Sequence, residues 1–289
     1  MTFGDQMVSN TALTAAAARA AHIVVDSPPH IFCDPIAEAL LGHLAAELIG
    51  YHSANPTHPI LAAARAQVVC RSRYAEDCLA DAVRRGVGQY LVLGAGLDSF
   101  AYRAAIASEV RVFEVDHPLT QQWKRAALAR ARIEEPDWLK YIAVDLAHGS
   151  LATALQDGGF DFSRPAVIAW LGVTMYLTQS DIEGVLSSLG GCAVGSELIA
   201  DYMLPAPLRD QAGSTYVELI AAAAAERGEP WQTFLSPADM TRLLRAHGWS
   251  PAAHLNQRGL VPAVMWDRQD ALQPIELSMV VRATVGGQR

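Results

Sequence analysis

The sequence predicts an α/β fold in which a mostly parallel sheet carries helices on both faces. Short apolar runs of strand length alternate along the chain with longer helix-forming segments, which is typical of right-handed βαβ units. Such short, continuous apolar runs suit strands that are covered on both faces. The chain has 289 residues, of which 51% are hydrophobic, so it contains enough apolar material for a large buried core.

The N-terminal part is expected to be helical. Three segments have helical spacing or composition: residues 10–21, 31–50 and 61–85. Pro28 and Pro29 should end the first segment, because proline lacks a backbone donor and restricts the residue before it. Gly86 and Gly88 suit the C-terminal cap of the third segment. A loop is expected over residues 51–59.

Five apolar runs follow, and each is a predicted strand: residues 89–93, 110–115, 141–144, 166–171 and 196–202. Helix-forming segments separate several of these runs: residues 119–132, 151–156 and 181–189. Strands connected in this way run parallel, so their carboxyl ends should meet at one edge of the sheet, where ligands bind in open α/β folds.

The C-terminal part departs from this alternation. Residues 203–235 contain prolines, a run of alanines and Trp231, and are expected to form a helical insert over the sheet edge. Ser236 is a predicted N-cap, followed by a proline at the first helical position. Residues 263–267 and 275–284 are predicted to pair as an antiparallel hairpin at the edge of the sheet.

Charge and composition exclude several classes of partner. A net charge of −8, from 30 acidic and 22 basic side chains, argues against nucleic acid, which is bound through clustered Lys and Arg. No apolar stretch approaches the roughly 20 residues needed to span a bilayer, and the N-terminus lacks the basic start of a signal peptide. We therefore expect a cytoplasmic protein with no membrane partner. The four cysteines lack CxxC spacing, so no metal site is expected.

A glycine turn follows the first predicted strand. Gly94 and Gly96 allow backbone N–H groups to approach a ligand. Asp116 ends the next apolar run, where a carboxylate can accept the hydrogens of both ribose hydroxyls, and Asp145 ends the third. Their shared placement favours a nucleoside site. Ser99 stands where the dinucleotide fingerprint has its third glycine, which counts against NAD.

These segments resemble the motifs of a known family, the leucine carboxyl methyltransferases. The family belongs to the class I S-adenosylmethionine-dependent methyltransferases and includes protein-phosphatase methylating enzymes, polyketide carboxyl methyltransferases and bacterial members. The resemblance extends from about residue 11 to residue 202, including the N-terminal region. The matching segments are RSRYAED at 71–77, LGAGLDSFAYR at 93–103, FEVDHP at 113–118 and VDL at 144–146.

The resemblance implies a Rossmann-like class I methyltransferase sheet, with an antiparallel C-terminal edge and helical lid elements, and S-adenosyl-L-methionine as the cofactor. It implies that Gly94, Ala95 and Gly96 contact the methionine part of the cofactor and that Asp116 contacts its ribose. It also implies that Asp145 and Leu146 frame the adenine.

Two further positions concern the rest of the cofactor. Arg71 matches the family arginine that pairs with the cofactor carboxylate, and Arg73 is the alternative if the register differs by one helical step. The chain departs from the family pattern at Leu171, where the family often has glutamate. A leucine accepts no hydrogen bond, so the pocket floor is expected to be more apolar here.

The resemblance favours an O-methyltransferase that acts on a small-molecule methyl acceptor, with a carboxylate preferred over a hydroxyl. His117, Tyr176 and Tyr202 follow strand ends and are the candidate catalytic residues. The alternatives are an NAD-dependent oxidoreductase and a non-catalytic protein that binds the cofactor. We expect one domain over residues 1–289, with a lid at residues 1–60 and an insert at residues 203–235 that caps the acceptor site.

Overall fold

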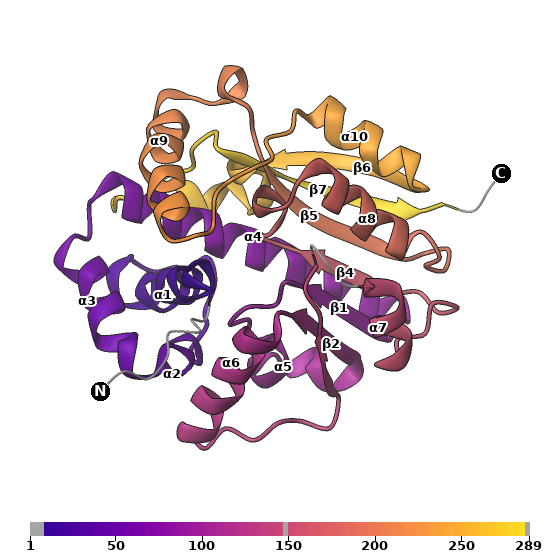
Figure 1. Ribbon diagram of the computed structural model, residues 1–289. Helices are drawn as coiled ribbons and strands as arrows, with labels where there is room; N and C mark the ends of the chain where they lie inside the picture. The colour runs from indigo at the N-terminus through magenta and orange to yellow at the C-terminus, as the bar shows by residue number, and fades with distance from the viewer. Residues whose placement is uncertain (1–8, 147–149, 287–289) are drawn as a thin grey trace.

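A seven-stranded sheet forms the centre of the computed structural model, which describes residues 9–146 and 150–286 (Figure 1). The strands lie in the order β3-β2-β1-β4-β5-β7-β6. Their bounds are β1 Gln89–Leu93, β2 Arg111–Asp116, β3 Leu139–Ala143, β4 Val167–Trp170, β5 Glu197–Met203, β6 Trp249–Asn256 and β7 Ser278–Val285. β1 to β5 run parallel, whereas β7 is antiparallel to β5 and β6 is antiparallel to β7. The predicted fold class, including the antiparallel C-terminal edge, is confirmed.

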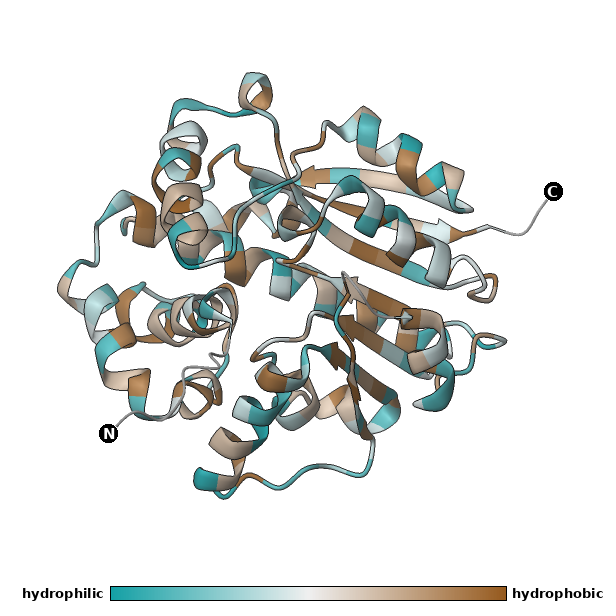
Figure 2. Cartoon of the chain, in the orientation of Figure 1, coloured by the Kyte–Doolittle hydropathy of each residue, from teal (hydrophilic) through white to brown (hydrophobic). Residues whose placement is uncertain are grey.

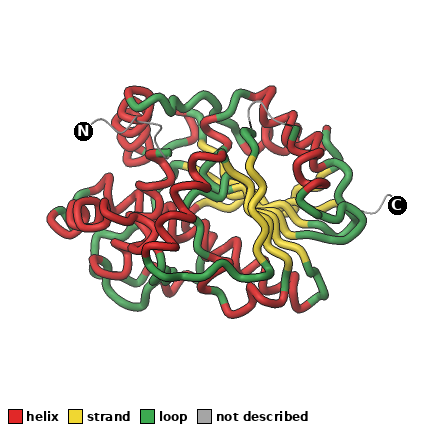
Figure 3. Tube along the Cα trace, turned by 60° about the horizontal axis from the view of Figure 1, so that its bottom comes forward, coloured by secondary structure: helices red, strands yellow, loops and turns green. Residues whose placement is uncertain are grey.

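Helices lie on both sides of this sheet, and Figure 3 shows the strands as a twisted layer between them. The helices are α4 Pro59–Arg84, α5 Phe100–Arg103, α6 Pro118–Arg130, α7 Leu151–Asp157, α8 Gln179–Leu189 and α10 Pro237–Ala246. Successive strand residues point to opposite faces, so Leu91 and Leu93 pack in the core formed with α7, α8 and α10, whereas Tyr90 and Val92 pack in the core formed with α4 and α5. The central strands β1 and β4 are accordingly buried along their length and mainly apolar, and the middle of the sheet is brown in Figure 2.

The N-terminal helices form a separate group beside the sheet. They are α1 Asn10–Val25, α2 Ala37–Leu41 and α3 Ala45–Ala54, with a short 3₁₀ turn before α3. Leu13, Leu40 and Leu41 pack with Leu97 of the glycine turn and with Leu128 of α6. The group therefore rests on the carboxyl edge of the sheet rather than on one of its faces.

Helix α9 (Gln211–Glu226) lies close to the N-terminal group, although about 190 residues separate it from α1 in the sequence (Figure 1). Tyr216 and Val217 of α9 pack with Met203 at the end of β5 and with Ala63 of α4. The insert and the N-terminal helices thus border the same edge of the sheet.

The predicted C-terminal hairpin needs a correction. Residues 263–267 are not a strand, because Ala263–Trp266 form a 3₁₀ turn that follows Pro262. The first strand of the hairpin is β6, which the sequence analysis did not predict and which contains Pro251. β6 is the last strand of the sheet, and a proline is tolerated there because one side of an edge strand makes no ladder hydrogen bonds.

Helix α10 begins as the sequence predicts. The Ser236 hydroxyl accepts a hydrogen bond from the backbone N–H of Asp239, and the Asp239 carboxylate accepts one from the backbone N–H of Ser236. Pro237 occupies the first helical turn, where its missing N–H is not needed. Within the described chain, no helix is both long enough and apolar enough to cross a membrane.

Candidate active site

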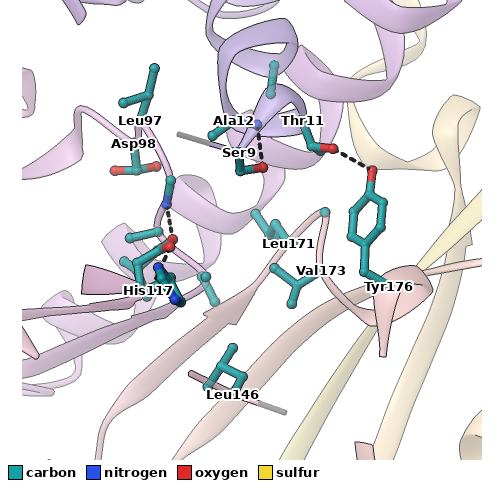
Figure 4. A pocket seen from close by; sticks show the side chains of 18 of the residues that line it. Ser9, Thr11, Ala12, Leu97, Asp98, His117, Leu146, Leu171, Val173 and Tyr176 are labelled. Atoms are coloured by element: carbon teal, nitrogen blue, oxygen red, sulfur yellow. Dashed lines mark hydrogen bonds between the residues drawn. The ribbon is translucent and has the colours of Figure 1, made fainter. Parts of the chain in front are cut away.

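A cavity of about 420 Å³ lies at the carboxyl ends of β1, β2 and β4, where the strand order reverses. This volume is within the range of small-molecule and cofactor sites. The cavity is lined by the glycine turn after β1, by the ends of β2 and β3, by α1 and α4, and by the segment that follows α9. Figure 4 shows several of these side chains directed toward one space.

The turn after β1 requires glycine at two positions. Gly94 and Gly96 have φ values of +63° and +53°, in the left-handed region that favours glycine. A Cβ added to Gly94 would lie 2.3 Å from Cγ2 of Val173, and one added to Gly96 would lie 3.1 Å from Cβ of Ala12. Both glycines and Ala95 line the cavity. The turn is a cradle that additional side chains would fill, which suits the close approach of a ligand to the backbone.

Substitution of Gly94 by alanine is expected to destabilise the fold and to displace the turn. The positive φ is strained for any L-residue by about 1–3 kcal/mol, and the overlap with Val173 forces a movement. Gly86→Ala is the matched control, because Gly86 has a φ of +91° but no atom within 4 Å of the added Cβ. Urea unfolding gives the loss of stability in each variant. Gly86→Ala reports the backbone strain alone, and Gly94→Ala reports the strain together with the overlap with Val173. Equal losses of stability would contradict the assigned overlap.

Asp116 connects the turn to the end of β2. Its Oδ2 accepts a hydrogen bond of 2.5 Å from the backbone N–H of Gly96, and its Oδ1 accepts one of 2.7 Å from the N–H of His117. Burial raises the pKa of Asp116 above its usual value, and the two backbone hydrogen bonds act in the opposite direction. Each carboxylate oxygen has more than one lone pair, so these bonds leave acceptor capacity on a residue that lines the cavity.

Asp145 and Leu146 line the same cavity at the end of β3. Their position follows from the parallel register, because β2 pairs with β3 and the N–H of Val144 donates to the carbonyl of Asp116. The structure therefore brings together the residues of three successive strand ends, in the order expected from the sequence. Leu171, at the end of β4, also lines the cavity and gives it an apolar surface there.

Arg71 reaches the cavity from α4. Its Nη1 donates a hydrogen bond of 2.8 Å to Oδ2 of Asp201, whose side chain is 1% exposed, and Asp201 also accepts a hydrogen bond of 2.6 Å from the N–H of Gly172. A guanidinium carries five N–H groups, so this bond does not use all of its donors. Arg73 lines no part of the cavity; it pairs with Asp77 along the same helix.

The three candidate catalytic residues lie in different environments. His117 lines the cavity as the N-cap of α6, and its Nδ1 accepts a hydrogen bond of 3.3 Å from the N–H of Leu119. Tyr176 also lines the cavity, and its hydroxyl lies 3.0 Å from Oγ1 of Thr11. Burial raises the pKa of Tyr176 above its usual value, an effect that the hydrogen bond with Thr11 opposes.

Tyr202 does not reach the cavity, contrary to the sequence-based expectation. Its side chain is 1% exposed and packs in the core that faces α7, α8 and α10, and its hydroxyl lies 2.7 Å from Nδ1 of His254. The reason is the alternation of side chains along β5, which sends Asp201 toward α4 and Tyr202 to the opposite face.

Sequence reasoning missed the part of the cavity wall that comes after α9. Gly228, Glu229, Pro230 and Gln232 line the cavity, although no local motif distinguishes them. They reach it because the N–H of Gln232 donates a hydrogen bond of 2.7 Å to the carbonyl of Met175. The predicted insert over residues 203–235 was the only signal that pointed to this segment.

A second cavity, of about 300 Å³, adjoins the first. It lies between α1, α3, α4 and α9, and apolar and aromatic side chains supply most of its lining, among them Met175, Met203, Tyr216 and Trp231. Both cavities are lined by a common set of residues: Thr11, Ala15, Val68, Arg71, Gly172, Tyr176 and Glu229. We call this set the shared wall.

The side chains that bind metals in other proteins do not cluster in the described part of this chain. Among the described residues, no three His, Cys, Asp or Glu side chains lie close enough to hold a metal ion together. All four cysteines are free thiols, and burial raises the pKa of Cys70 and of Cys192 to about 12. These buried thiols therefore stay protonated near neutral pH.

Comparison with known proteins adds independent findings. The family model described as leucine carboxyl methyltransferase matches residues 12–190. A protein from Bacillus subtilis named "Putative S-adenosyl-L-methionine-dependent methyltransferase YktD" is 30% identical over 217 residues, which is 74% of this chain and 71% of that protein. A protein from Mycobacteroides abscessus named "Putative S-adenosyl-L-methionine-dependent methyltransferase" is 33% identical over 266 residues, which is 84% of this chain and 82% of that protein.

Solved structures resemble the fold at lower sequence identity. A crystal structure of a protein from Thermobifida fusca, described as a putative methyltransferase, has a TM-score of 0.60 and 18% identity, with 99% of this chain and 100% of that chain covered. A DUF574 family protein from Streptomyces avermitilis has a TM-score of 0.60 and 16% identity, with 94% and 97% covered. These likenesses show the fold.

Proposed function

The chain belongs to the leucine carboxyl methyltransferase family, and from this membership we propose that it is an O-methyltransferase acting on a small molecule. That the chain is an S-adenosylmethionine-dependent methyltransferase follows from the family and its relatives. The nature of the acceptor is our proposal, and one observation carries it. The second, mainly apolar cavity adjoins the first and is separated from it only by the shared wall.

The cofactor fits the chemistry of the first cavity. We propose that Asp116 accepts the hydrogens of the ribose hydroxyls, that Asp145 and Leu146 border the adenine, and that the cradle at Gly94 receives the methionine part. Arg71 would pair with the cofactor carboxylate, because an arginine fork suits a carboxylate and the residue lines this cavity. The side chain of Leu171 accepts no hydrogen bond, so its contacts with the cofactor would be apolar.

The positions of these groups support methyl transfer from a cofactor in the first cavity to an acceptor in the second cavity, at the shared wall. Asp116 and Leu146 line only the first cavity, whereas Arg71 and Gly172 line both, so the methionine end of the cofactor would lie nearest the second cavity. When bound, the cofactor supplies a methyl group activated by a positively charged sulfur. The chain contributes alignment of the two reactants and exclusion of water, which are the main contributions a protein makes to such a displacement.

Two helical elements would act as covers for these cavities. We propose that the N-terminal helices, within residues 1–60, form a lid over the cofactor and that residues 203–235 cap the acceptor. Arg19 of α1 supports the first part, because its Nη2 donates a hydrogen bond of 2.5 Å to the carbonyl of Leu97 in the glycine turn, and it also pairs with Asp34. Tyr216 and Trp231 in the second cavity support the other part.

Radiolabelled methyl transfer tests the proposed function. The full chain is incubated with S-adenosylmethionine that carries a labelled methyl group and with an organic extract of bacterial metabolites. We expect label in a small organic product that mass spectrometry identifies as an O-methyl compound. Cofactor binding without any labelled product would support the alternative of a non-catalytic binding protein.

A further inference from the structure

A continuous chain of hydrogen-bonding groups runs through the shared wall. Oγ1 of Thr11 lies 3.0 Å from the hydroxyl of Tyr176 and 2.7 Å from Oε2 of Glu229. Figure 4 shows the side chains of Thr11 and Tyr176 directed toward one another. All three residues line both cavities, so the chain begins at a phenol that borders the acceptor side and ends at a carboxylate.

Glu229 is held in place at the end of this chain. Its Oε2 also accepts a hydrogen bond of 3.0 Å from the backbone N–H of Thr11. A carboxylate can only accept, whereas the hydroxyl of Thr11 has one hydrogen that it can give to either neighbour. A hydroxyl in that position can give its hydrogen to the carboxylate and take another from the phenol. The arrangement is therefore able to transmit a proton from Tyr176 to Glu229.

We propose that Tyr176, Thr11 and Glu229 form a proton relay that removes the proton from a hydroxyl acceptor, so that the substrate is an apolar alcohol or phenol. This inference rests on the proposed function and chooses between its two acceptor classes. A carboxylic acid, with a pKa near 4, is already ionised at neutral pH and needs no base, whereas a phenol near 10 or an alcohol does. A relay that removes a proton is therefore useful for a hydroxyl acceptor and not for a carboxylate acceptor.

The charges on the shared wall agree with a neutral acceptor. Glu229 would repel an anion. Arg71 pairs with Asp201, and its remaining donors are those that we assign to the cofactor carboxylate. His52 lines the second cavity, but burial lowers its pKa to about 4, so it is neutral at pH 7. Arg227 lines the second cavity without lining the first, so its cation is not at the shared wall where transfer would occur.

The step balances in atoms and charge. The acceptor oxygen forms a bond to the methyl carbon as the carbon–sulfur bond breaks, and the electron pair of that bond stays on sulfur. The acceptor gives its proton to the oxygen of Tyr176, which passes its own proton to Thr11, and Thr11 passes its hydrogen to Glu229. The sulfonium becomes a neutral thioether and the carboxylate becomes a neutral acid, which later releases the proton to water.

The class of product tests the inference without any variant. The full chain is incubated with labelled S-adenosylmethionine and the same metabolite extract, and the labelled product is treated with alkali and, separately, with hydriodic acid. A methyl ether keeps its label in alkali and releases it as methyl iodide in hydriodic acid. A methyl ester loses its label in alkali as volatile methanol. Label lost entirely to alkali would overturn the relay and leave the proposed function intact, whereas no labelled product would refute both.

Substitutions along the relay give a second test with a built-in control. Thr11→Val keeps the shape but removes the hydroxyl, and Glu229→Gln removes the acceptor of the proton. We expect each to slow methyl transfer by about 100-fold or more, the usual size of a general-base contribution. Thr11→Ser should restore transfer to within about threefold of the native rate on the same basis.

Calorimetry with S-adenosylhomocysteine distinguishes a relay from a structural role. We expect Thr11→Val and Glu229→Gln to bind it within about threefold of the native affinity, because the hydrogen bond from Thr11 to Glu229 is made between protein groups. Native transfer rates in both variants, or a Thr11→Ser variant as slow as Thr11→Val, would overturn the relay.

Discussion

Replacement of Asp116 by alanine is expected to lower the affinity for S-adenosylhomocysteine by at least about 100-fold. This lower bound corresponds to the loss of two hydrogen bonds to a charged acceptor, each contributing about 1.5 kcal/mol, the low end of the usual range. The change also removes the acceptor for the N–H of Gly96, so the glycine turn loses a contact with the end of β2. Isothermal titration calorimetry measures the change directly.

The control for this variant is Asp157→Ala. Asp157 is an exposed aspartate on α7 that does not line the cavity. Its replacement changes the net charge by the same amount as Asp116→Ala does. We expect it to bind S-adenosylhomocysteine with native affinity. An Asp116→Ala variant that is folded and binds as tightly as the control would remove Asp116 from the cofactor site.

The same residue should make cofactor affinity depend on pH. Burial raises the pKa of Asp116, so it takes up a proton at a higher pH than an ordinary aspartate does. A protonated carboxyl accepts fewer hydrogen bonds, so affinity is present when the group is ionised and is lost as the pH falls through the raised pKa. Asp116→Asn resembles the protonated form. We expect its affinity to change little with pH and the native affinity to approach it in acid.

Replacement of Arg71 by leucine is expected to destabilise the protein by about 3–5 kcal/mol, because it leaves the buried carboxylate of Asp201 without its cationic partner. Burial of an unpaired charge accounts for most of this loss. Cofactor affinity should fall as well if Arg71 holds the cofactor carboxylate. Urea unfolding followed by circular dichroism measures the stability, and calorimetry measures the affinity.

Two variants control for the loss of arginine. Arg73→Leu removes a neighbouring arginine of the same helix whose ion pair with Asp77 is partly exposed, so we expect a loss of no more than about 1 kcal/mol. The double variant Arg71→Leu/Asp201→Asn removes the buried charge together with its partner and should recover part of the stability. Similar losses for Arg71→Leu and Arg73→Leu would show that the pair with Asp201 is not structurally important.

The cofactor side of the site was largely predictable from the sequence. Gly94, Asp116 and Asp145 each follow an apolar run, and parallel pairing of those runs places their ends together. These residues lie on consecutive strands of the chain, so their proximity follows from the parallel pairing alone. The glycines are required by the local backbone geometry of the turn. Each of these residues lines the cavity, and their roles toward the cofactor remain predictions that the Asp116 variants test.

The acceptor side was less predictable, since it is formed by segments that are far apart in the sequence. Thr11 and Glu229 are separated by 218 residues, and neither belongs to a recognisable motif for proton transfer. Tyr176 and Tyr202 looked equivalent because both follow predicted strands, yet the first reaches the shared wall and the second is buried in the core.

The sequence by itself determined the α/β architecture, the glycine turn and the family, because apolar periodicity, turn geometry and motif spacing are local properties of the chain. Only the tertiary structure decided which side chain of β5 faces α4, where the edge strand containing Pro251 pairs, and which carboxylate meets Thr11. Those outcomes depend on the packing of helices against the edge of the sheet, and the free energy of that packing comes from contacts between residues that are distant in the sequence.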